Sequence, residues 1–276
     1  MLVLQIEDII KNALLEDMNN GDITTENLIG LNDISEAEII AKEDGVLAGI
    51  EIAEITFKLL DKDMLFYRLK EDGQFLRKGD VIAKIKGKTR AILSGERTAL
   101  NFLQRLSGIA TKTKKFVDKV EKYNVRVADT RKTTPGIRAL EKYAVRLGGG
   151  ANHRYNLSDA VMIKDNHIRA VGSIEKAIKL IRERVPHTVK VEVEVETIEQ
   201  FKQALDAGAD IIMLDNMSIE DMKEAVNINN KKAILEASGN VNIDNIEEVA
   251  KTGVDVISVG ALTHSVKSLD ISLNIK

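Results

Sequence analysis

The sequence predicts an α/β protein whose C-terminal part is an incomplete barrel of parallel strands. From Val125 onward, short runs rich in β-branched residues alternate with helical segments. This alternation is typical of parallel strands joined by helical crossovers. About six such strands are visible, fewer than the eight of a complete βα barrel. The predicted strands lie in the runs at 125–130, 160–166, 188–196, 210–216, 232–238 and 254–260.

Length and composition narrow the class of protein further. The 276 residues are 44% hydrophobic, enough for a sizeable core in one barrel or two unequal domains. The net charge of −3 gives no general attraction to nucleic acid or to anionic membranes. The absence of cysteine excludes disulfides, thiolate metal sites and cysteine nucleophiles, and fits a cytoplasmic protein. The acidic N-terminus lacks the basic start of a signal peptide, and we expect no membrane span.

The N-terminal part shows a different pattern from the predicted barrel. Residues 1–18 have helical spacing of apolar side chains. Residues 36–87 contain short alternating runs separated by glycines, which predicts a small sheet with tight turns. A helix at 50–60 is expected within this sheet region.

The longest helical pattern covers residues 90–123. Ser94 is a candidate N-cap, which would place Arg97 in the first turn, where a cation opposes the helix dipole. A cation at a position that the helix dipole disfavours suggests that this residue has a role outside its own helix. A surface salt bridge is the alternative explanation. The Ser107-Gly108 pair is expected to divide the pattern into two helices and to mark the domain boundary.

Every predicted barrel strand ends in polar residues that could perform chemistry. One polar strand end is ordinary, because helices need caps. Six in succession favour a catalytic site, because active sites of βα barrels are built from the carboxyl ends of the strands. The groups expected to meet at this mouth are at 129–132, 164–166, 194–196, 215–216, 236–239 and 260–261.

A dense group of cations lies in the segment from Asp129 to His167, although the whole chain is slightly acidic. Arginine suits bidentate binding of carboxylates and phosphates, so the segment predicts a site for a polyanionic small molecule. For three helical residues, Arg138, Lys142 and Arg146, a solvated helix face is the alternative, and only Arg138 is kept as a candidate. The other cations are Arg131, Lys132, His153, Arg154 and Lys164.

Carboxylates at the same mouth would repel each other unless a hard cation or a developing positive charge lay between them. Asp215, Glu194 and Asp165 are therefore candidates for holding Mg²⁺, through oxygen ligands and water. The last two strand ends, at 237–240 and 258–261, are glycine-bearing turns of the kind that binds phosphate in βα barrels. The residues alone predict an enzyme for a phosphorylated, carboxylated substrate and leave the reaction open.

Several segments resemble the quinolinate phosphoribosyltransferase family, also called carboxylating nicotinate-nucleotide pyrophosphorylases. The matches keep the family order and extend from about Gly21 to the C-terminus. The longest is DTRKTTPGIRALEKYAVRLGGGANHRYNLSDAVMIKDNH, from Asp129 to His167. The others are GDITTE, ERTALNFLQRLSGIAT, EVEVE, IIMLDN, LEASGNV and ISVGALTHS.

The resemblance implies a reaction and an assembly. Quinolinate and 5-phosphoribosyl-1-pyrophosphate would give nicotinate mononucleotide, pyrophosphate and CO₂, with Mg²⁺, in NAD biosynthesis. The implied fold is that of a type II phosphoribosyltransferase: an N-terminal α/β sandwich domain (1–107) and an open, incomplete C-terminal α/β barrel (108–264). The tail at 265–276 is expected to pack back on the first domain. The chain would form homodimers with shared active sites, which could assemble further into a hexamer.

The resemblance also implies roles for residues at matching positions. Arg97 would reach into the partner's site. The cations that would bind the two quinolinate carboxylates and the pyrophosphate are Arg131, Lys132, His153, Arg154 and Lys164. The catalytic set would be Lys132, Lys164, Glu194 and Asp215, with the two acids facing the ribose hydroxyls and Mg²⁺. The 5-phosphate would be held by Ser238, Gly239, Asn240, Gly260 and Ala261, with His264 nearby.

Some alternatives remain open. Strand alternation puts Glu192, Glu194 and Glu196 on one face, and Glu194 is chosen by its position in the family pattern. His153 is expected to bind an anion, with a hydrogen-bonded structural histidine as the alternative. Rival functions are a phosphoribosyltransferase for another nitrogenous acid, a phosphate-binding lyase or isomerase with Lys164 as a Schiff base, and a nucleic-acid-binding module. The near-neutral net charge argues against the last.

Overall fold

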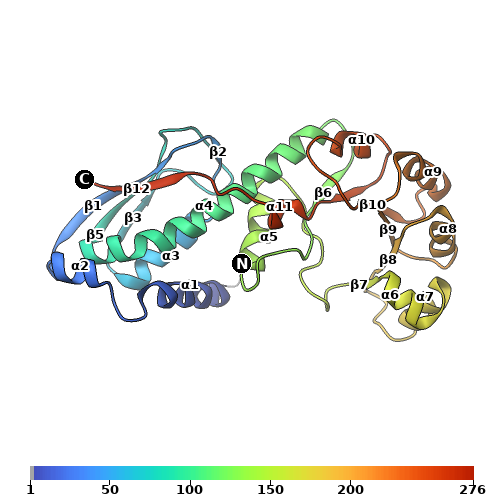
Figure 1. The fold of residues 1–276 in the computed structure, drawn as a ribbon, viewed down its shortest axis with the longest axis horizontal. Coiled ribbons are helices and arrows are strands. Elements are labelled where there is room, and N and C mark those ends of the chain that lie inside the picture. Colours follow the sequence, from blue (N-terminus) through green and yellow to red (C-terminus); the bar gives the residue numbers. More distant parts are fainter. Residues whose placement is uncertain (1–2) are drawn as a thin grey trace. The chain divides into compact units, whose positions relative to one another are not determined.

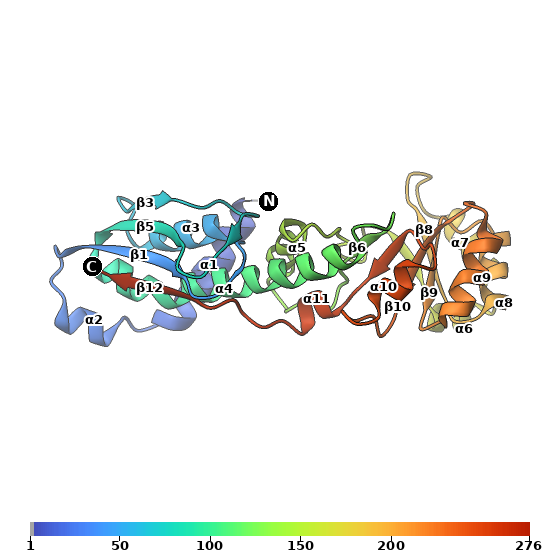
Figure 2. The same ribbon diagram turned by 90° about the horizontal axis from the view of Figure 1, so that it is seen from above.

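The computed structural model describes residues 3–276, which form two compact units (Figures 1 and 2). The first unit comprises Met1–Lys114, Thr133–Gly149 and Ser265–Lys276. The second unit comprises Lys115–Lys132 and Gly150–His264. Among the described residues, no helix has the length and apolar character needed to cross a membrane.

The first unit is built on a four-stranded antiparallel sheet in the order β12-β1-β5-β3, accompanied by a two-stranded pair β2-β4. Its helices and strands are α1 (Val3–Met18), α2 (Ile23–Leu28), β1 (Ile34–Ala41), β2 (Gly45–Val46), α3 (Ile50–Leu60), β3 (Leu65–Arg68), β4 (Phe75–Leu76), β5 (Val81–Lys88), most of α4 (Thr89–Val120), α5 (Arg138–Leu147) and β12 (Ile271–Ile275). The predicted helices at 1–18 and 50–60 are observed, although residues 1–2 lie outside the described part.

Helices α3 and α4 pack on this sheet and close a single apolar core (Figure 1). Alternate residues of β1 and β5 are buried, as expected for strands with one covered face. Phe57 of α3 and Leu103 of α4 are fully buried against Ile39 of β1 and Ile85 of β5. Burying one such side chain stabilises the fold by about 1.5–3 kcal/mol.

The prediction that Ser107-Gly108 divides the long helix is wrong. Helix α4 continues from Thr89 to Val120. The Ser107 hydroxyl accepts a hydrogen bond from the Ala48 backbone N–H at 3.0 Å, within the core. A Cβ on Gly108 would lie 2.3 Å from the Lys267 carbonyl oxygen. The two residues are small because other backbone segments approach the helix there, which helical periodicity does not reveal.

The predicted start of the same helix is also wrong. The helix begins at Thr89, so Ser94 and Arg97 lie beyond its first turn and the argument from the helix dipole does not apply. Instead of capping, the Ser94 hydroxyl donates a hydrogen bond to an Asp22 carboxylate oxygen at 2.9 Å. Asp22 is itself the N-cap of α2, and it accepts from the Thr25 backbone N–H. Arg97 is exposed on α4.

The compact units differ from the predicted domains in two respects. The first unit extends along α4 to Lys114, and it includes the segment Thr133–Gly149 that was assigned to the barrel. The polar residues of α5 explain the second difference. Glu141 is fully buried and accepts a hydrogen bond from Arg105 of α4 at 2.8 Å. Lys142 is also fully buried, so the prediction of a solvated helix face is wrong for this residue. The tail returns to the first unit, where β12 pairs with β1.

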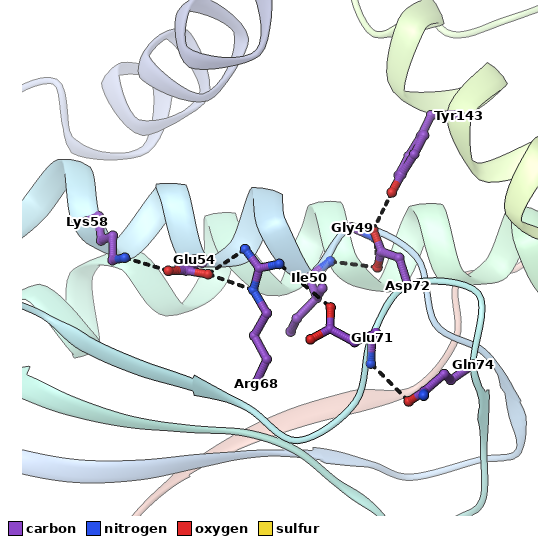
Figure 3. Close-up of polar contacts among 9 residues, drawn as sticks. All are labelled: Gly49, Ile50, Glu54, Lys58, Arg68, Glu71, Asp72, Gln74 and Tyr143. Atoms are coloured by element: carbon purple, nitrogen blue, oxygen red, sulfur yellow. Dashed lines mark hydrogen bonds and ion pairs between the residues drawn. The ribbon is translucent and has the colours of Figure 1, made fainter. Parts of the chain in front are cut away.

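A polar network joins α5 to the loop between β3 and β4 (Figure 3). One Asp72 oxygen accepts from the backbone N–H groups of Gly49 and Ile50 at 2.8 and 3.0 Å, and so caps α3. The other oxygen accepts from the Tyr143 hydroxyl at 2.8 Å. Burial raises the pKa of Asp72 above its ordinary value, against the effect of these hydrogen bonds. On the same side of α3, Arg68 forms a two-pronged pair with Glu54.

The second unit is an open parallel sheet of six strands in the order β6-β11-β10-β9-β8-β7, with β6 and β7 as its edges. The predicted incomplete barrel of about six strands is therefore confirmed. Its elements are β6 (Arg126–Ala128), β7 (Val161–Ile163), α6 (Asp165–Val171), α7 (Ile174–Arg182), β8 (Val191–Val195), α8 (Ile198–Asp206), β9 (Ile211–Asp215), α9 (Ile219–Asn229), β10 (Ile234–Ser238), α10 (Ile246–Ala250), β11 (Val256–Ser258) and α11 (Ala261–His264).

Helices α7, α8 and α9 lie side by side along the outside of this sheet (Figures 1 and 2). Each begins at a hydroxyl residue whose side chain accepts a hydrogen bond from a backbone N–H in the first turn. These caps are Ser173, Thr197 and Ser218. The residues that cap α8 and α9 lie beyond the ends of β8 and β9, so the side chains at those strand ends are available for a site.

Tyr143→Phe tests the network of Figure 3. The change removes the hydroxyl that Asp72 accepts from and leaves a partly buried carboxylate oxygen without that donor. We expect the free energy of unfolding to fall by about 1–3 kcal/mol in urea denaturation. Tyr67→Phe is the matched control, because Tyr67 is 55% exposed, and it should change stability by less than about 0.5 kcal/mol. Equal effects of the two substitutions would contradict this account.

Candidate active site

A cavity of about 370 Å³ opens at the carboxyl ends of the strands of the second unit. Many of the predicted site residues line it, namely Arg131, Lys132, His153, Arg154, Lys164, Glu194, Asp215 and Ser238. The structure therefore brings residues from most of the predicted strand-end groups, together with His153 and Arg154 of a loop, to one cavity. Others lie just past β10 and β11 and outside this lining: Gly239, Asn240, Gly260, Ala261 and His264. Arg97 belongs to the first unit.

A buried carboxylate holds the loop that delivers His153 and Arg154. Asp129 follows β6 and is fully buried. Its two oxygens accept from the Asn152 side-chain amide at 2.6 Å and from the His153 backbone N–H at 2.8 Å. The backbone of Ala151 also forms a parallel bridge with β6. The end of β6 and the loop after Gly150 are therefore fastened to each other at the cavity wall.

Arg154 is oriented by its guanidinium contacts. It donates to the Ala160 carbonyl oxygen at 3.0 Å, and another guanidinium nitrogen lies 3.5 Å from the Met162 sulfur. Burial and the positive charge of Arg131 lower the pKa of Arg154 from its usual value. Two guanidinium groups close enough to disfavour each other's charge are a costly arrangement unless an anion binds between them.

The ammonium of Lys164 forms an ion pair with the Glu194 carboxylate at the cavity rim. Glu194 ends β8 with its side chain partly exposed. Of the other two glutamates in this run, Glu192 is buried deeper in the barrel, whereas Glu196 lies past the end of β8 and is exposed. Glu194 alone of the three therefore lines the cavity. The candidate Asp165 begins α6 and pairs with Arg169 at 3.4 Å.

Hydrogen bonds join the turns that follow β9 and β10. Asn216, Gly239 and Asn240 have left-handed backbone conformations, with φ of 53°, 91° and 52°. The Asn216 backbone N–H donates to the Ser238 carbonyl oxygen at 2.9 Å, and its side-chain oxygen accepts from the Asn240 amide at 2.9 Å. The Asn216 amide also donates to Asp215 at 3.0 Å. Asp215 and Ser238 are in register on neighbouring strands, so this turn sets the position of both.

Gly260 makes room for a cation. A Cβ at this position would lie 3.0 Å from Cδ of Lys132 and 3.2 Å from the ring of His264. The Thr263 hydroxyl donates to the Lys132 carbonyl oxygen at 2.7 Å. The turn after β11 thus fixes the backbone of Lys132 and leaves a channel for its side chain.

His153 lies over two carboxylates within the barrel. Its Nε2 atom is 3.3 Å from Glu192 Oε2 and 3.5 Å from Glu236 Oε1. Both glutamates are buried. Burial, followed by the negative charge of Glu192, raises the pKa of Glu236 to about 7. The site therefore contains an acid that holds its proton near neutral pH, below a rim of cations.

A second cavity, of about 900 Å³, opens at the amino ends of the strands. Two aspartates on its wall serve the backbone. Asp210 accepts from the Val191 N–H at 2.7 Å, and Asp255 accepts from the Leu235 N–H at 2.8 Å. Because this end of a βα barrel usually supports stability and the carboxyl ends carry catalysis, we assign the smaller cavity as the active site.

The sequence models of both domains of one family match this chain. That of the quinolinate phosphoribosyl transferase C-terminal domain matches residues 109–274, and that of the N-terminal domain matches residues 22–107. The chain belongs to the quinolinate phosphoribosyltransferase family. The predicted recognition and fold are therefore confirmed.

Relatives of this family match along almost the whole chain. The probable nicotinate-nucleotide pyrophosphorylase (carboxylating) of Bacillus subtilis is 47% identical over 272 residues, covering 99% of this chain and 94% of that protein. The crystal structure of NadC from Streptococcus pyogenes has a TM-score of 0.97 at 44% identity, covering 100% of this chain and 98% of that chain. The nicotinate-nucleotide pyrophosphorylase from Francisella tularensis has a TM-score of 0.94 at 43% identity, covering 99% and 96%.

Five residues that line the cavity were given no individual role by the sequence: Thr130, Met162, Met213, Glu236 and Ser258. Thr130, Glu236 and Ser258 lay within the predicted strand-end groups, whereas the two methionines did not. Glu236 and Ser258 are polar residues in or beside predicted strand ends, so the sequence could have marked them as site residues. Neither was chosen, because family position rather than depth in the barrel guided the choice. The two methionines read as core residues in the sequence, and nothing in the pattern distinguishes them from the rest of the core.

Gly239→Ala tests the locked turn. The added Cβ would lie 2.2 Å from the Asn216 side-chain oxygen, in a left-handed backbone conformation. Gly208→Ala is the matched control, because its φ is +80° and the space around it is open. The control should lower the free energy of unfolding by about 1–2 kcal/mol, because of backbone strain alone. Gly239→Ala should lower the free energy of unfolding by about 1–3 kcal/mol more than the control does, as measured by urea denaturation. Equal losses in the two variants would show that the turn accommodates the added Cβ without strain.

Proposed function

We propose that this protein transfers the phosphoribosyl group of 5-phosphoribosyl-1-pyrophosphate to quinolinate and decarboxylates the product. The products are nicotinate mononucleotide, pyrophosphate and CO₂, in NAD biosynthesis. The observation that carries the proposal is a cavity where cations from three separate segments face two carboxylates, in a chain of this family. The basic residues of this cavity are Arg131, Lys132, His153, Arg154 and Lys164, of which the arginines and lysines carry the positive charge.

The number of cations supports a dicarboxylate acceptor. Quinolinate brings two carboxylates and the pyrophosphate group brings further negative charge. Arg131 and Arg154 suit planar, bidentate carboxylate binding, whereas Lys132 and Lys164 act as point charges for phosphate. A phosphoribosyltransferase for a monocarboxylate such as nicotinate is the main alternative, and it would need fewer cations facing the acceptor.

The two carboxylates at the rim suit the ribose end of the donor. Loss of pyrophosphate from C1 builds positive charge on the sugar, which Glu194 and Asp215 would stabilise. Their oxygens are also the ligands that Mg²⁺ prefers, so these residues fit a magnesium ion held directly or through water. Bound there, Mg²⁺ would neutralise charge on the leaving pyrophosphate.

The acceptor nitrogen needs no deprotonation, because its lone pair attacks C1 directly. After transfer, the ring nitrogen is positively charged and stabilises the electron pair that stays on C2 when the 2-carboxylate departs as CO₂. The protein then needs to orient the acceptor, which is the role of Arg131 and Arg154. The 5-phosphate would bind at the turns after β10 and β11, where Ser238, Gly239, Asn240, Gly260 and Ala261 offer backbone N–H groups and His264 lies nearby.

We further propose that the protein is a cytoplasmic homodimer with shared active sites. The exposed Arg97 on α4 would complete the cation set in the site of the partner subunit. Dimers could assemble further into hexamers. The absence of cysteine is in keeping with a reducing compartment.

A phosphate-binding lyase or isomerase that uses Lys164 as a Schiff base is the second alternative. A Schiff base needs a neutral amine. Lys164 instead forms an ion pair with Glu194, which argues against this function. Failure of borohydride to trap a carbonyl substrate on the protein would exclude it.

The central prediction is release of CO₂ from carboxyl-labelled quinolinate when phosphoribosyl pyrophosphate and Mg²⁺ are present. Chelation of Mg²⁺ should abolish release, and Lys132→Ala should lower kcat about 100- to 1,000-fold by removing one preorganised charge. Nicotinate in place of quinolinate is the control for the monocarboxylate alternative. The proposal is falsified if wild-type protein releases no CO₂ under these conditions.

Shared sites lead to a prediction for mixed subunits. Arg97→Ala and Lys132→Ala chains should each be nearly inactive alone. After unfolding and refolding together, heterodimers should recover about one intact site each, or about a quarter of wild-type activity for random pairing, because each site takes Arg97 from one subunit and Lys132 from the other. Activity is measured against each variant refolded alone, and no recovery would argue against sharing.

A further inference from the structure

A carboxylic acid forms part of the floor of a cavity whose rim is cationic. Glu236 of β10 lines the cavity and is 4% exposed. Its Oε1 atom has no hydrogen-bond partner among the described residues. An ionised carboxylate at this place would repel the dianionic acceptor of the proposed reaction. A neutral acid would not, and its O–H could act as a donor toward whatever fills the cavity.

The contacts of His153 show where the protons of this cluster lie. The Arg154 backbone N–H donates to Nδ1 of His153 at 2.8 Å. Nδ1 is thus the acceptor nitrogen, and the ring proton of the neutral imidazole belongs on Nε2. Nε2 faces Glu192 Oε2 at 3.3 Å and Glu236 Oε1 at 3.5 Å. The histidine therefore donates to Glu192, whose Oε1 is 3.4 Å from Nε2, and has both ring nitrogens engaged, which makes it a positioning residue.

The same atoms could in principle hold a metal ion, since one ligand atom from each of His153, Glu192 and Glu236 lies within 4.8 Å of the others. A metal on Nε2 would require the ring proton to move to Nδ1. Nδ1 already accepts a hydrogen bond from the Arg154 N–H, so two hydrogens would collide there. The geometry fits a cluster that holds protons better than one that holds a metal.

The charges around Glu236 favour its protonated form. Burial raises its pKa to about 7, and the negative charge of Glu192 on β8 adds to this effect. His153 and, more weakly, Arg126 on β6 act in the opposite direction. The cations Arg131, Lys132, Arg154 and Lys164 line the same cavity. Glu236 is thus an acid that is protonated below neutral pH and loses its proton as the pH rises through about 7.

We propose that Glu236 is the acid that protonates the ring carbon from which CO₂ departs. This inference rests on the proposed function. The bond between C2 and the carboxylate breaks, CO₂ leaves, and the electron pair stays on C2. The Glu236 O–H bond then breaks, its proton forms the new C–H bond, and Glu236 becomes a carboxylate that solvent reprotonates. His153 positions this acid, and the negative charge of Glu192 maintains its protonation.

Glu236→Gln separates this role from the transfer step. The amide keeps the size and the neutral charge of the protonated acid but cannot release a proton. In rapid-quench single turnovers with ring-labelled quinolinate, pyrophosphate should appear within about threefold of the wild-type rate. Nicotinate mononucleotide should appear about 100-fold more slowly, which is the low end of what general acids contribute. The dicarboxylated nucleotide should accumulate in the interval.

Glu192→Gln is the matched control, because Glu192 belongs to the same cluster but does not line the cavity. Well below pH 7, where Glu236 keeps its proton in either protein, it should form nicotinate mononucleotide in step with pyrophosphate. In wild type, the rate of decarboxylation should fall as the pH rises through about 7. Glu192→Gln should move this fall to lower pH, because a like charge is removed, and Glu236→Gln should lack it.

Each outcome has one meaning. Parallel loss of both products in Glu236→Gln, or no delay between them, would overturn the assignment of Glu236 as the acid. Wild-type protein that releases no pyrophosphate from quinolinate would instead overturn the proposed function. Binding of labelled quinolinate to Glu236→Gln, compared with wild type, shows whether the variant retains a folded cavity. A folded variant with no delay between the products would assign Glu236 a structural role.

Discussion

The parallel register of the second sheet is the constraint on which the site depends. Parallel strands place their carboxyl ends at one edge, so residues far apart in the chain become neighbours there. Met213 of β9 is in register with Glu194 of β8 and with Glu236 of β10. One step further along, Asp215 is in register with Ser238. At the level of Met213, Glu236 is buried whereas Glu194 is partly exposed.

The burial of each glutamate determines which protonation state is favoured, and therefore its chemical role. Glu194 is partly exposed at the rim and its charge is balanced by Lys164. Glu236 lies almost wholly out of water, where a charged carboxylate is costly and the neutral form is favoured. Two residues of the same chemical type can thus have opposite protonation within one cavity. Acid chemistry and charge stabilisation become possible side by side without any unusual side chain.

The loops that follow the strands are also needed to position the residues of the site. Asp129 fastens the loop that carries His153, and the left-handed turn at Asn216 and Gly239 joins the ends of β9 and β10. These contacts use backbone groups and short polar side chains, which have few rotamers to lose. The cations on the loops are therefore presented by a rigid frame, which preorganised electrostatic catalysis requires.

The sequence by itself determined the classes of elements, the six parallel strands, the polar strand ends and the family. These features depend on local periodicity and on residues near one another in the chain. Tertiary structure decided the continuity of α4 past Ser107, the burial of Glu141 and Lys142, and the depths of Glu192, Glu194 and Glu236. Alternation along a strand tells which face a side chain takes. How far that side chain lies from water depends on neighbouring strands and loops, which local pattern does not contain.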